Sequence, residues 1–198
     1  RSFDLGSSTG KVGTFGDTGA NQQFRLRSIE PLLDDATYCI FSEVNNEAFQ
    51  SPTDVNQDDT NNPSINNLFT STFDNNDNFQ KFELSYQFTN PLGDIYKIKN
   101  IGTNSYVGLK DNWCGDSGEV IAKYSISDNN VEIIVSQDET TGRYLFRKND
   151  NGNGCSYFDL AGGASGAKIQ TFNDTGNNQQ FRVVKDGTLV FDGTWSPS

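Results

Sequence analysis

Two segments near opposite ends of the chain carry almost the same residues, and this repeat constrains the fold more than any other feature of the sequence. Phe-Asp-Leu occurs at residues 3–5 and again at 158–160. Each copy is followed by Thr-Phe-x-Asp-Thr-Gly-x-Asn-Gln-Gln-Phe-Arg, at residues 14–25 and 171–182. A match of this length does not arise by chance, so we expect a protein built from repeated structural units.

Two weaker copies lie between these segments. In all four copies, two large apolar side chains stand nine residues apart. The pairs are Phe15 and Phe24, Phe73 and Phe82, Tyr124 and Ile133, and Phe172 and Phe181. The second member of each pair is predicted to lie in the core, at one recurring position of the repeat.

Each copy contains short stretches of alternating or β-branched apolar residues, separated by turns of Asn, Asp and Gly. In the third copy these stretches span about 95–99, 105–109, 119–124 and 130–135. Such stretches are typical of β-strands, and 23 Asn and 19 Gly suit tight turns because both residues tolerate left-handed backbone angles. We therefore predict an all-β protein with an aromatic core drawn from 15 Phe, 7 Tyr and 2 Trp.

Charge and residue types exclude several classes of function. A net charge of -11 repels phosphate backbones, so nucleic acid is not an expected partner. The chain has no His and no CxxC pair, which excludes a His-dependent catalytic triad and a Cys/His zinc site. Asp-Thr-Gly turns at 17–19 and 174–176 offer oxygen ligands, but nothing has the spacing of a calcium-binding EF-hand loop. We expect no metal and no other cofactor.

Apolar runs and cysteines bear on the environment of the chain. No run of about 18 apolar residues is present, and the first twenty residues lack the pattern of a signal peptide. We expect a soluble, already processed chain with no membrane insertion. Cys39, Cys114 and Cys155 are an odd number whose pairing the sequence does not assign, and we expect one disulfide and one free thiol.

Four-strand units of about 40 residues that end in Gln-x-Phe resemble the ricin B-type lectin family, which repeats a Gln-x-Trp motif and folds as a β-trefoil. The resemblance covers nearly the whole chain. The residues that carry it are Asp4 and Asp159 on the second strand, Phe15 and Phe172 after the third, and Asn-Gln-Gln-Phe at 21–24 and 178–181 opening the fourth. It implies a single β-trefoil domain over residues 1–198.

The number of units exceeds what a trefoil needs, because a trefoil closes with three. The expected units span about 1–30 (partial), 36–88, 94–136 and 142–185, with a mobile surface insertion at 51–67 in the second. Three explanations stay open. A C-terminal strand at 187–195 pairs with the N-terminal segment, the chain is a fragment of a longer tandem protein, or the register of one middle unit is different.

By the same resemblance, the last unit contains a complete carbohydrate site. Asp159 would accept hydrogen bonds from two adjacent sugar hydroxyls, and Phe172 would stack on the apolar face of the sugar ring. Asn178 would supply paired amide contacts. Gln179 would hold either Asp159 or the sugar, and Gln170 matches a further polar position of the family.

The first unit repeats this set with fewer contacts. Its candidate residues are Asp4, Phe15, Asn21 and Gln22, with Gly13 at the position of Gln170. The two middle units lack the set and are expected to be structural. The residues that replace it there are Gln50, Phe79, Gly108 and Val131.

Alternatives stay open for some of these residues. Gln22 and Gln179 would serve equally well as scaffold hydrogen-bonders between hairpins, and Phe15 and Phe172 could be core residues instead of exposed platforms. The chain's single N-glycosylation sequon begins at Asn173, where a glycan would lie beside the predicted site.

The resemblance implies a secreted or extracellular lectin without enzymatic activity. Its partners would be glycans or glycoproteins carrying galactose or N-acetylgalactosamine, with avidity from two sites or from assembly into a homo-oligomer. A second reading is a protein-binding trefoil, such as a protease inhibitor, that acts through the 51–67 loop. A third is a glycosidase with paired carboxylates, but the sequence specifies no second carboxylate near Asp159 or Asp4.

Overall fold

Short antiparallel strands form almost all of the regular structure of this computed structural model, which describes residues 2–5, 12–15, 30–55, 66–110, 115–123, 131–150 and 153–187. The chain divides into two compact parts, Arg1–Glu30 and Pro31–Ser198. In the N-terminal part, β1 (Ser2–Leu5) pairs with β2 (Val12–Phe15) in an antiparallel two-stranded sheet.

Twelve of the described strands of the part Pro31–Ser198 form one antiparallel sheet. The first four are β3 (Ala36–Ser42), β4 (Ala48–Gln50), β5 (Phe69–Ser71) and β6 (Phe82–Asn90). The next four are β7 (Gly93–Asn100), β8 (Tyr106–Leu109), β9 (Val120–Lys123) and β10 (Glu132–Gln137). The last four are β11 (Tyr144–Asp150), β12 (Asn153–Leu160), β13 (Ile169–Phe172) and β14 (Phe181–Lys185). We refer to these three groups as the first complete unit, the middle unit and the last unit of the barrel.

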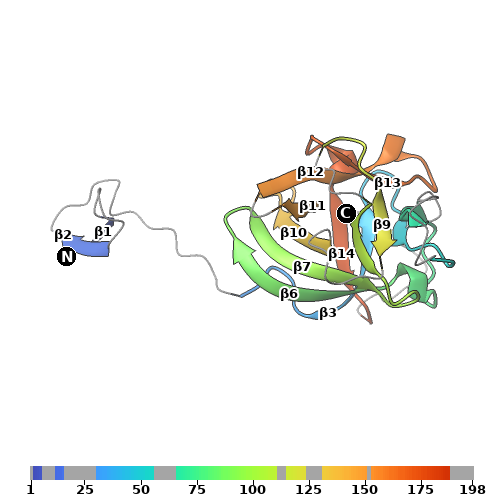
Figure 1. The fold of residues 1–198 in the computed structure, drawn as a ribbon, viewed down its shortest axis with the longest axis horizontal. Coiled ribbons are helices and arrows are strands. Elements are labelled where there is room, and N and C mark those ends of the chain that lie inside the picture. The colour runs from blue at the N-terminus through green and yellow to red at the C-terminus, as the bar shows by residue number, and fades with distance from the viewer. Residues whose placement is uncertain are drawn as a thin grey trace. The chain divides into compact units, whose positions relative to one another are not determined.

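Six of these strands close into a barrel in the order β3, β6, β7, β10, β11, β14 and back to β3 (Figure 1). The other six pair as β4–β5, β8–β9 and β12–β13, and each pair joins the barrel through β3, β7 or β11. A closed six-stranded barrel with three hairpins is a β-trefoil. The predicted all-β trefoil fold is therefore confirmed.

The three units of the barrel repeat one another in register. The first-strand tyrosine of each unit lies opposite the recurring apolar residue near the start of the fourth strand. These pairs are Tyr38 with Phe82, Tyr96 with Ile133, and Tyr144 with Phe181. All three fourth-strand residues are fully buried, as the nine-residue spacing predicts, and burying such a side chain contributes about 1.5–3 kcal/mol. Phe24, the fourth predicted member, lies outside the described residues.

The core contains a cluster of aromatic rings, but most of its buried side chains are aliphatic, so the predicted aromatic core is correct only in part. The rings of Phe49 and Phe181 meet edge to face with centroids 4.9 Å apart. Phe146 lies between Phe181 and Phe158, at 5.8 and 6.2 Å from their ring centroids. Phe49 comes from β4 and the other three rings come from β11, β12 and β14, so this cluster joins the first complete unit and the last unit in one core. Alternation places them there, because every second residue of a strand faces the same side.

Several predictions of the chain's organisation lie partly outside the described residues. Of the expected insertion at 51–67, residues 51–55 and 66–67 are described, and the C-terminal strand expected at 187–195 is described only at Gly187. The single domain over 1–198 stays a prediction. Cys155 is disulfide-bonded and Cys39 is a free, buried thiol, whereas Cys114 lies outside the described residues. Within the described part, no helix is long and apolar enough to cross a membrane.

Candidate functional site

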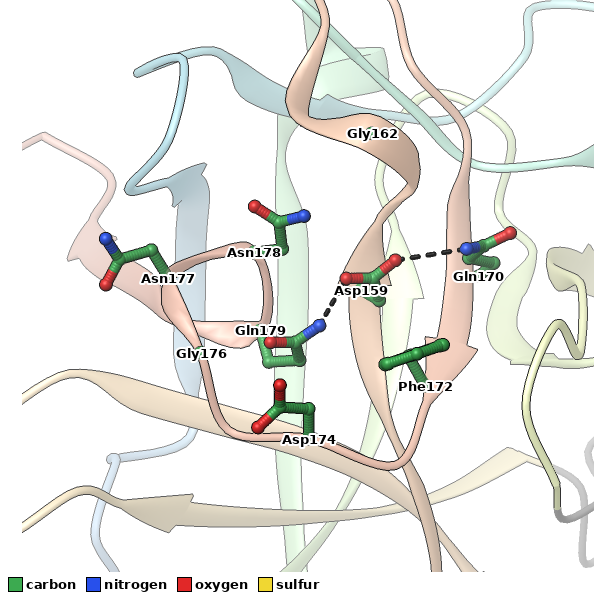
Figure 2. Close-up of a pocket in the computed structure, with 9 residues that line it drawn as sticks. All are labelled: Asp159, Gly162, Gln170, Phe172, Asp174, Gly176, Asn177, Asn178 and Gln179. Atoms are coloured by element: carbon green, nitrogen blue, oxygen red, sulfur yellow. Dashed lines mark hydrogen bonds between the residues drawn. The ribbon is translucent and has the colours of Figure 1, made fainter.

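A pocket of about 450 Å³ opens at the hairpin of the last unit (Figure 2). Its walls come from β12, β13 and two single-turn 3-10 helices, η5 (Ala161–Gly163) and η6 (Asn177–Gln179). The lining residues are Asp159, Gly162, Gln170, Phe172, Asp174, Gly176, Asn177, Asn178 and Gln179. The pocket thus brings together all five residues that the sequence indicates for the last unit.

Strand register places the polar residues in this pocket. Phe158 and Leu160 are buried in the core, so the alternation of β12 turns Asp159 to the opposite face. Asp159 lies opposite Gln170 on β13, and Phe172 follows two residues later on the same face. The pocket is therefore assembled by an ordinary two-stranded hairpin.

Asp159 forms the buried floor of the pocket, with only 4% of its surface exposed. Gln170 Nε2 donates to its Oδ2 at 3.1 Å, and Gln179 Nε2 donates to its Oδ1 (Figure 2). Burial raises the pKa of Asp159, the two glutamine hydrogen bonds oppose this shift, and the charge of Asp174 adds to it. A carboxylate has about four acceptor sites, so Asp159 can still accept from a ligand.

Phe172 presents an exposed ring at the end of β13. It is 43% exposed, which decides against a core position for this side chain. Asn178 is half-buried in the lining of the same pocket. A large apolar ring in water next to a buried carboxylate is the chemical combination that a ligand with both apolar and hydroxyl-bearing surfaces requires.

The loop between η5 and β13 is fixed by a second buried carboxylate, Glu47, from the turn between β3 and β4. Glu47 accepts hydrogen bonds from Ser165 Oγ, from Gly166 N at 3.0 Å and from Thr70 Oγ1 at 2.8 Å. Burial would raise the pKa of Glu47, but these hydrogen bonds outweigh it and the pKa is lowered. Glu47 thus anchors the loop that begins at the pocket wall.

Gly163, at the end of η5, brings this loop close to the β3–β4 turn. Its φ of +66° is a left-handed angle that favours glycine. A Cβ atom at this position would lie 2.8 Å from Val44 Cγ1 and 3.7 Å from Asn178 Oδ1. The wall of the pocket therefore packs against the first strand pair of a different unit.

Sequence reasoning missed two polar residues of the pocket, Asp174 and Asn177. Asp174 corrects the expectation that no second carboxylate lies near Asp159, because both line the same pocket. A usable signal was present in the sequence: Asp174 belongs to the repeated Thr-Phe-x-Asp-Thr-Gly segment and follows Phe172 by two residues.

The predicted site of the first unit is described only in part. The β1–β2 register sets Asp4 opposite Gly13, as the β12–β13 register sets Asp159 opposite Gln170. Phe15 ends β2 as Phe172 ends β13. Asn21 and Gln22 lie outside the described residues. This first-unit site therefore stays a prediction.

The first complete unit of the barrel differs in one respect from the match of the repeats by nine-residue spacing, which sets Phe73 at the position of Phe172. Gln50 lies opposite Phe69, as Asp159 lies opposite Gln170, so Ser71 and not Phe73 corresponds to Phe172. The reason is a longer loop, with six residues (72–77) between strand and 3-10 turn against four (173–176) in the last unit. The nine-residue spacing is therefore misleading for Phe73.

Comparison with solved structures shows the fold. The Rhizoctonia solani agglutinin superposes with a TM-score of 0.60 at 15% identity, over 77% of this chain and 96% of that chain. A ricin B-like lectin from Macrolepiota procera, in complex with lactose, gives 0.58 at 13% identity, over 79% and 99%. An exo-β-1,3-galactanase from Clostridium thermocellum gives 0.60 at 18% identity, over 90% of this chain and 32% of that chain. No protein-family model matches the sequence, and neither does any curated protein. At these identities, the likeness establishes the β-trefoil fold and leaves the function to be argued from the pocket.

Proposed function

We propose that this chain is a lectin that binds a galactose-type sugar in the pocket around Asp159. The observation that carries the proposal is that one pocket holds a buried carboxylate, an exposed phenyl ring and several side-chain amides. A sugar combines hydroxyls with an apolar C–H face, and these groups match both surfaces.

In this proposal, different residues of the pocket contact the hydroxyls and the apolar face of the sugar. Asp159 is held by Gln170 and Gln179 and keeps acceptor sites for two adjacent sugar hydroxyls. Phe172 provides the apolar platform, and Asn178 supplies amide contacts at the rim. Galactose and N-acetylgalactosamine have an axial hydroxyl that leaves one ring face apolar, which suits stacking on Phe172.

Two structural neighbours support the galactose type. The lectin from Macrolepiota procera was solved with lactose, which contains galactose, and the Clostridium thermocellum enzyme is a galactanase. This chain spans about a third of that enzyme. We propose glycans or glycoproteins outside the cell as partners, with homo-oligomerisation as a source of avidity.

We propose binding without catalysis. A glycosidase needs a carboxylic acid that holds a proton for the leaving group. Each carboxylate oxygen of Asp159 instead accepts an N–H from a glutamine, and these two hydrogen bonds oppose the rise in its pKa that burial causes. Incubation with lactose should release no monosaccharide, and release that Asp159→Asn abolishes would show an enzyme.

A glycan array of the wild type beside Asp159→Ala tests the proposal. Circular dichroism checks that each protein is folded, and Gln50→Ala serves as the control because Gln50 occupies the matching position of the first complete unit. We expect signals on galactose-terminated glycans that Asp159→Ala loses and Gln50→Ala keeps. A wild type that binds no glycan contradicts the proposal.

A further inference from the structure

We infer that the pocket selects sugars by charge, rejecting those with an acidic group and accepting neutral and cationic ones, and that Asp174 sets this preference. The inference deepens the proposed lectin function and rests on it. It names the chemical class of ligand that the site takes.

The lining of the pocket is acidic. Asp159 and Asp174 supply two carboxylates, and the other seven lining residues are Gly, Asn, Gln and Phe. Among the residues that the structure describes, no basic side chain lines the pocket. Recognition of a sugar carboxylate or sulfate relies on charge-assisted hydrogen bonds, above all from Arg.

Asp174 is the exposed member of this pair. It lies on the loop between β13 and η6, where Figure 2 shows its side chain on the same side of the pocket as Gln179. Its Oδ1 accepts from the backbone N–H of Thr175 at 2.7 Å. Within the described part of the chain, the ion pairs involve other carboxylates, so its charge is not neutralised by a Lys or Arg there.

The charge of Asp174 reaches the binding floor. It contributes to raising the pKa of Asp159, which means that the two carboxylates interact across the pocket. The net charge of -11 adds a repulsive field around any acidic ligand. A sugar carboxylate bound above Asp159 would therefore meet negative charge on two sides.

Coulomb's law sets the size of the effect. For two unit charges about 6 Å apart, repulsion lowers affinity by about 3-fold in water-like surroundings and by about 100-fold at the effective dielectric of a protein surface. A cationic sugar gains affinity by the same mechanism. The effect should shrink in salt, because the Debye length falls from about 30 Å at 0.01 M to about 3 Å at 1 M.

Three sugars with the same galactose ring test the inference: galactosamine, methyl galactoside and galacturonic acid. Calorimetry at both salt concentrations, at a pH where the amine and all carboxylates are charged, measures their affinities. We expect the order cationic, neutral, anionic, with a neutral-to-anionic ratio of 3-fold or more at low salt and a smaller ratio at high salt.

Two variants assign the effect to one residue. Asp174→Asn removes the charge and keeps an oxygen for the Thr175 N–H, so the neutral-to-anionic ratio should fall by about 3-fold or more. Glu139→Gln changes the net charge equally at an exposed residue outside the pocket lining and should leave the ratio unchanged.

The outcomes separate the inference from the proposed function. If methyl galactoside binds but the ratio is absent, or is the same in Asp174→Asn, the inference is wrong and the lectin function stands. If none of the three sugars binds at either salt concentration, the proposed function is wrong and the inference falls with it.

Discussion

The first complete unit of the barrel, β3 to β6, and the last unit, β11 to β14, share a scaffold but present different surfaces. In both units a buried glutamine ahead of the fourth strand reaches the end of the second strand. Gln179 donates to Asp159, and Gln80 donates to Gln50 at 3.2 Å. Because this bond also occurs in a unit that has Gln50 in place of Asp159 and Ser71 in place of Phe172, we assign it to the scaffold, to which the proposed sugar site adds the carboxylate of Asp159.

The same comparison supports the prediction that the first complete unit is structural. Phe79 stands where the last unit has Asn178, and it packs so closely on Gly102 that a Cβ there would lie 2.7 Å from Phe79 Cδ1. Ser71 stands where the last unit has the exposed ring of Phe172. The missing ring and the filled space beside it are what we expect of a structural unit.

The largest expected effect on binding comes from Asp159→Asn. It removes the charge that accepts sugar hydroxyls, and a hydrogen bond to a charged group contributes about 1.5–3 kcal/mol, or about 10- to 150-fold in affinity. The fold should survive, because burial already disfavours the charged form of Asp159. Calorimetry and thermal unfolding check both statements, and unchanged sugar affinity in a folded variant would place the site elsewhere.

Truncation of the two scaffold glutamines sharpens the comparison. Gln179→Ala and Gln80→Ala each leave buried hydrogen-bonding groups without their partner, so each should lower the free energy of unfolding by about 1–3 kcal/mol. Sugar affinity should fall in Gln179→Ala alone, because Asp159 is then no longer held. Equal affinity losses in the two variants would mean that stability, and not the pocket, governs binding.

Much of the fold was predictable from sequence, and the reasons are local. Alternation and the recurring fourth-strand residue place Phe82, Ile133 and Phe181 correctly in the core. The misassignment of Phe73 has a physical cause. The loop after β5 is two residues longer than the loop after β13, so Phe73 keeps the nine-residue distance to Phe82 although it lies beyond the end of β5. Spacing along the chain cannot distinguish these two cases.

The candidate site was predictable where its residues are polar or aromatic and belong to the repeat. The five residues indicated in the last unit do line one pocket. The role of Glu47 was not predictable, because its hydrogen bonds to Ser165 and Gly166 join segments more than a hundred residues apart in sequence. Contacts of this kind follow from barrel closure and leave no local pattern.

Truncation of two phenylalanines should have opposite consequences. Phe172→Ala removes an exposed ring, so sugar affinity should fall by about 2- to 12-fold, the equivalent of about 0.5–1.5 kcal/mol, with little change in stability. Phe73 packs on Phe41 with ring centroids 5.1 Å apart, so Phe73→Ala should lower stability by about 1–2 kcal/mol and leave affinity unchanged. Calorimetry and urea unfolding of both variants check this, and a loss of stability without loss of affinity in Phe172→Ala contradicts it.

The smallest expected effect is a pH dependence in which binding and stability move in opposite directions. The pKa of folded Asp159 is raised above its ordinary value of 3.8, so the folded state binds this proton more tightly than the unfolded state does. Ionisation of Asp159 therefore opposes folding above the raised pKa, and this cost disappears as the pH falls through that pKa toward 3.8. Across the same window the protonated carboxyl loses acceptor sites for sugar hydroxyls, so affinity should fall.

Unfolding curves of the Asp159→Asn variant, measured at each pH and subtracted from those of the wild type, remove the contribution of every other carboxylate. The difference should show the wild type gaining stability while it loses affinity, whereas a parallel loss of both would indicate general acid unfolding and not protonation of Asp159.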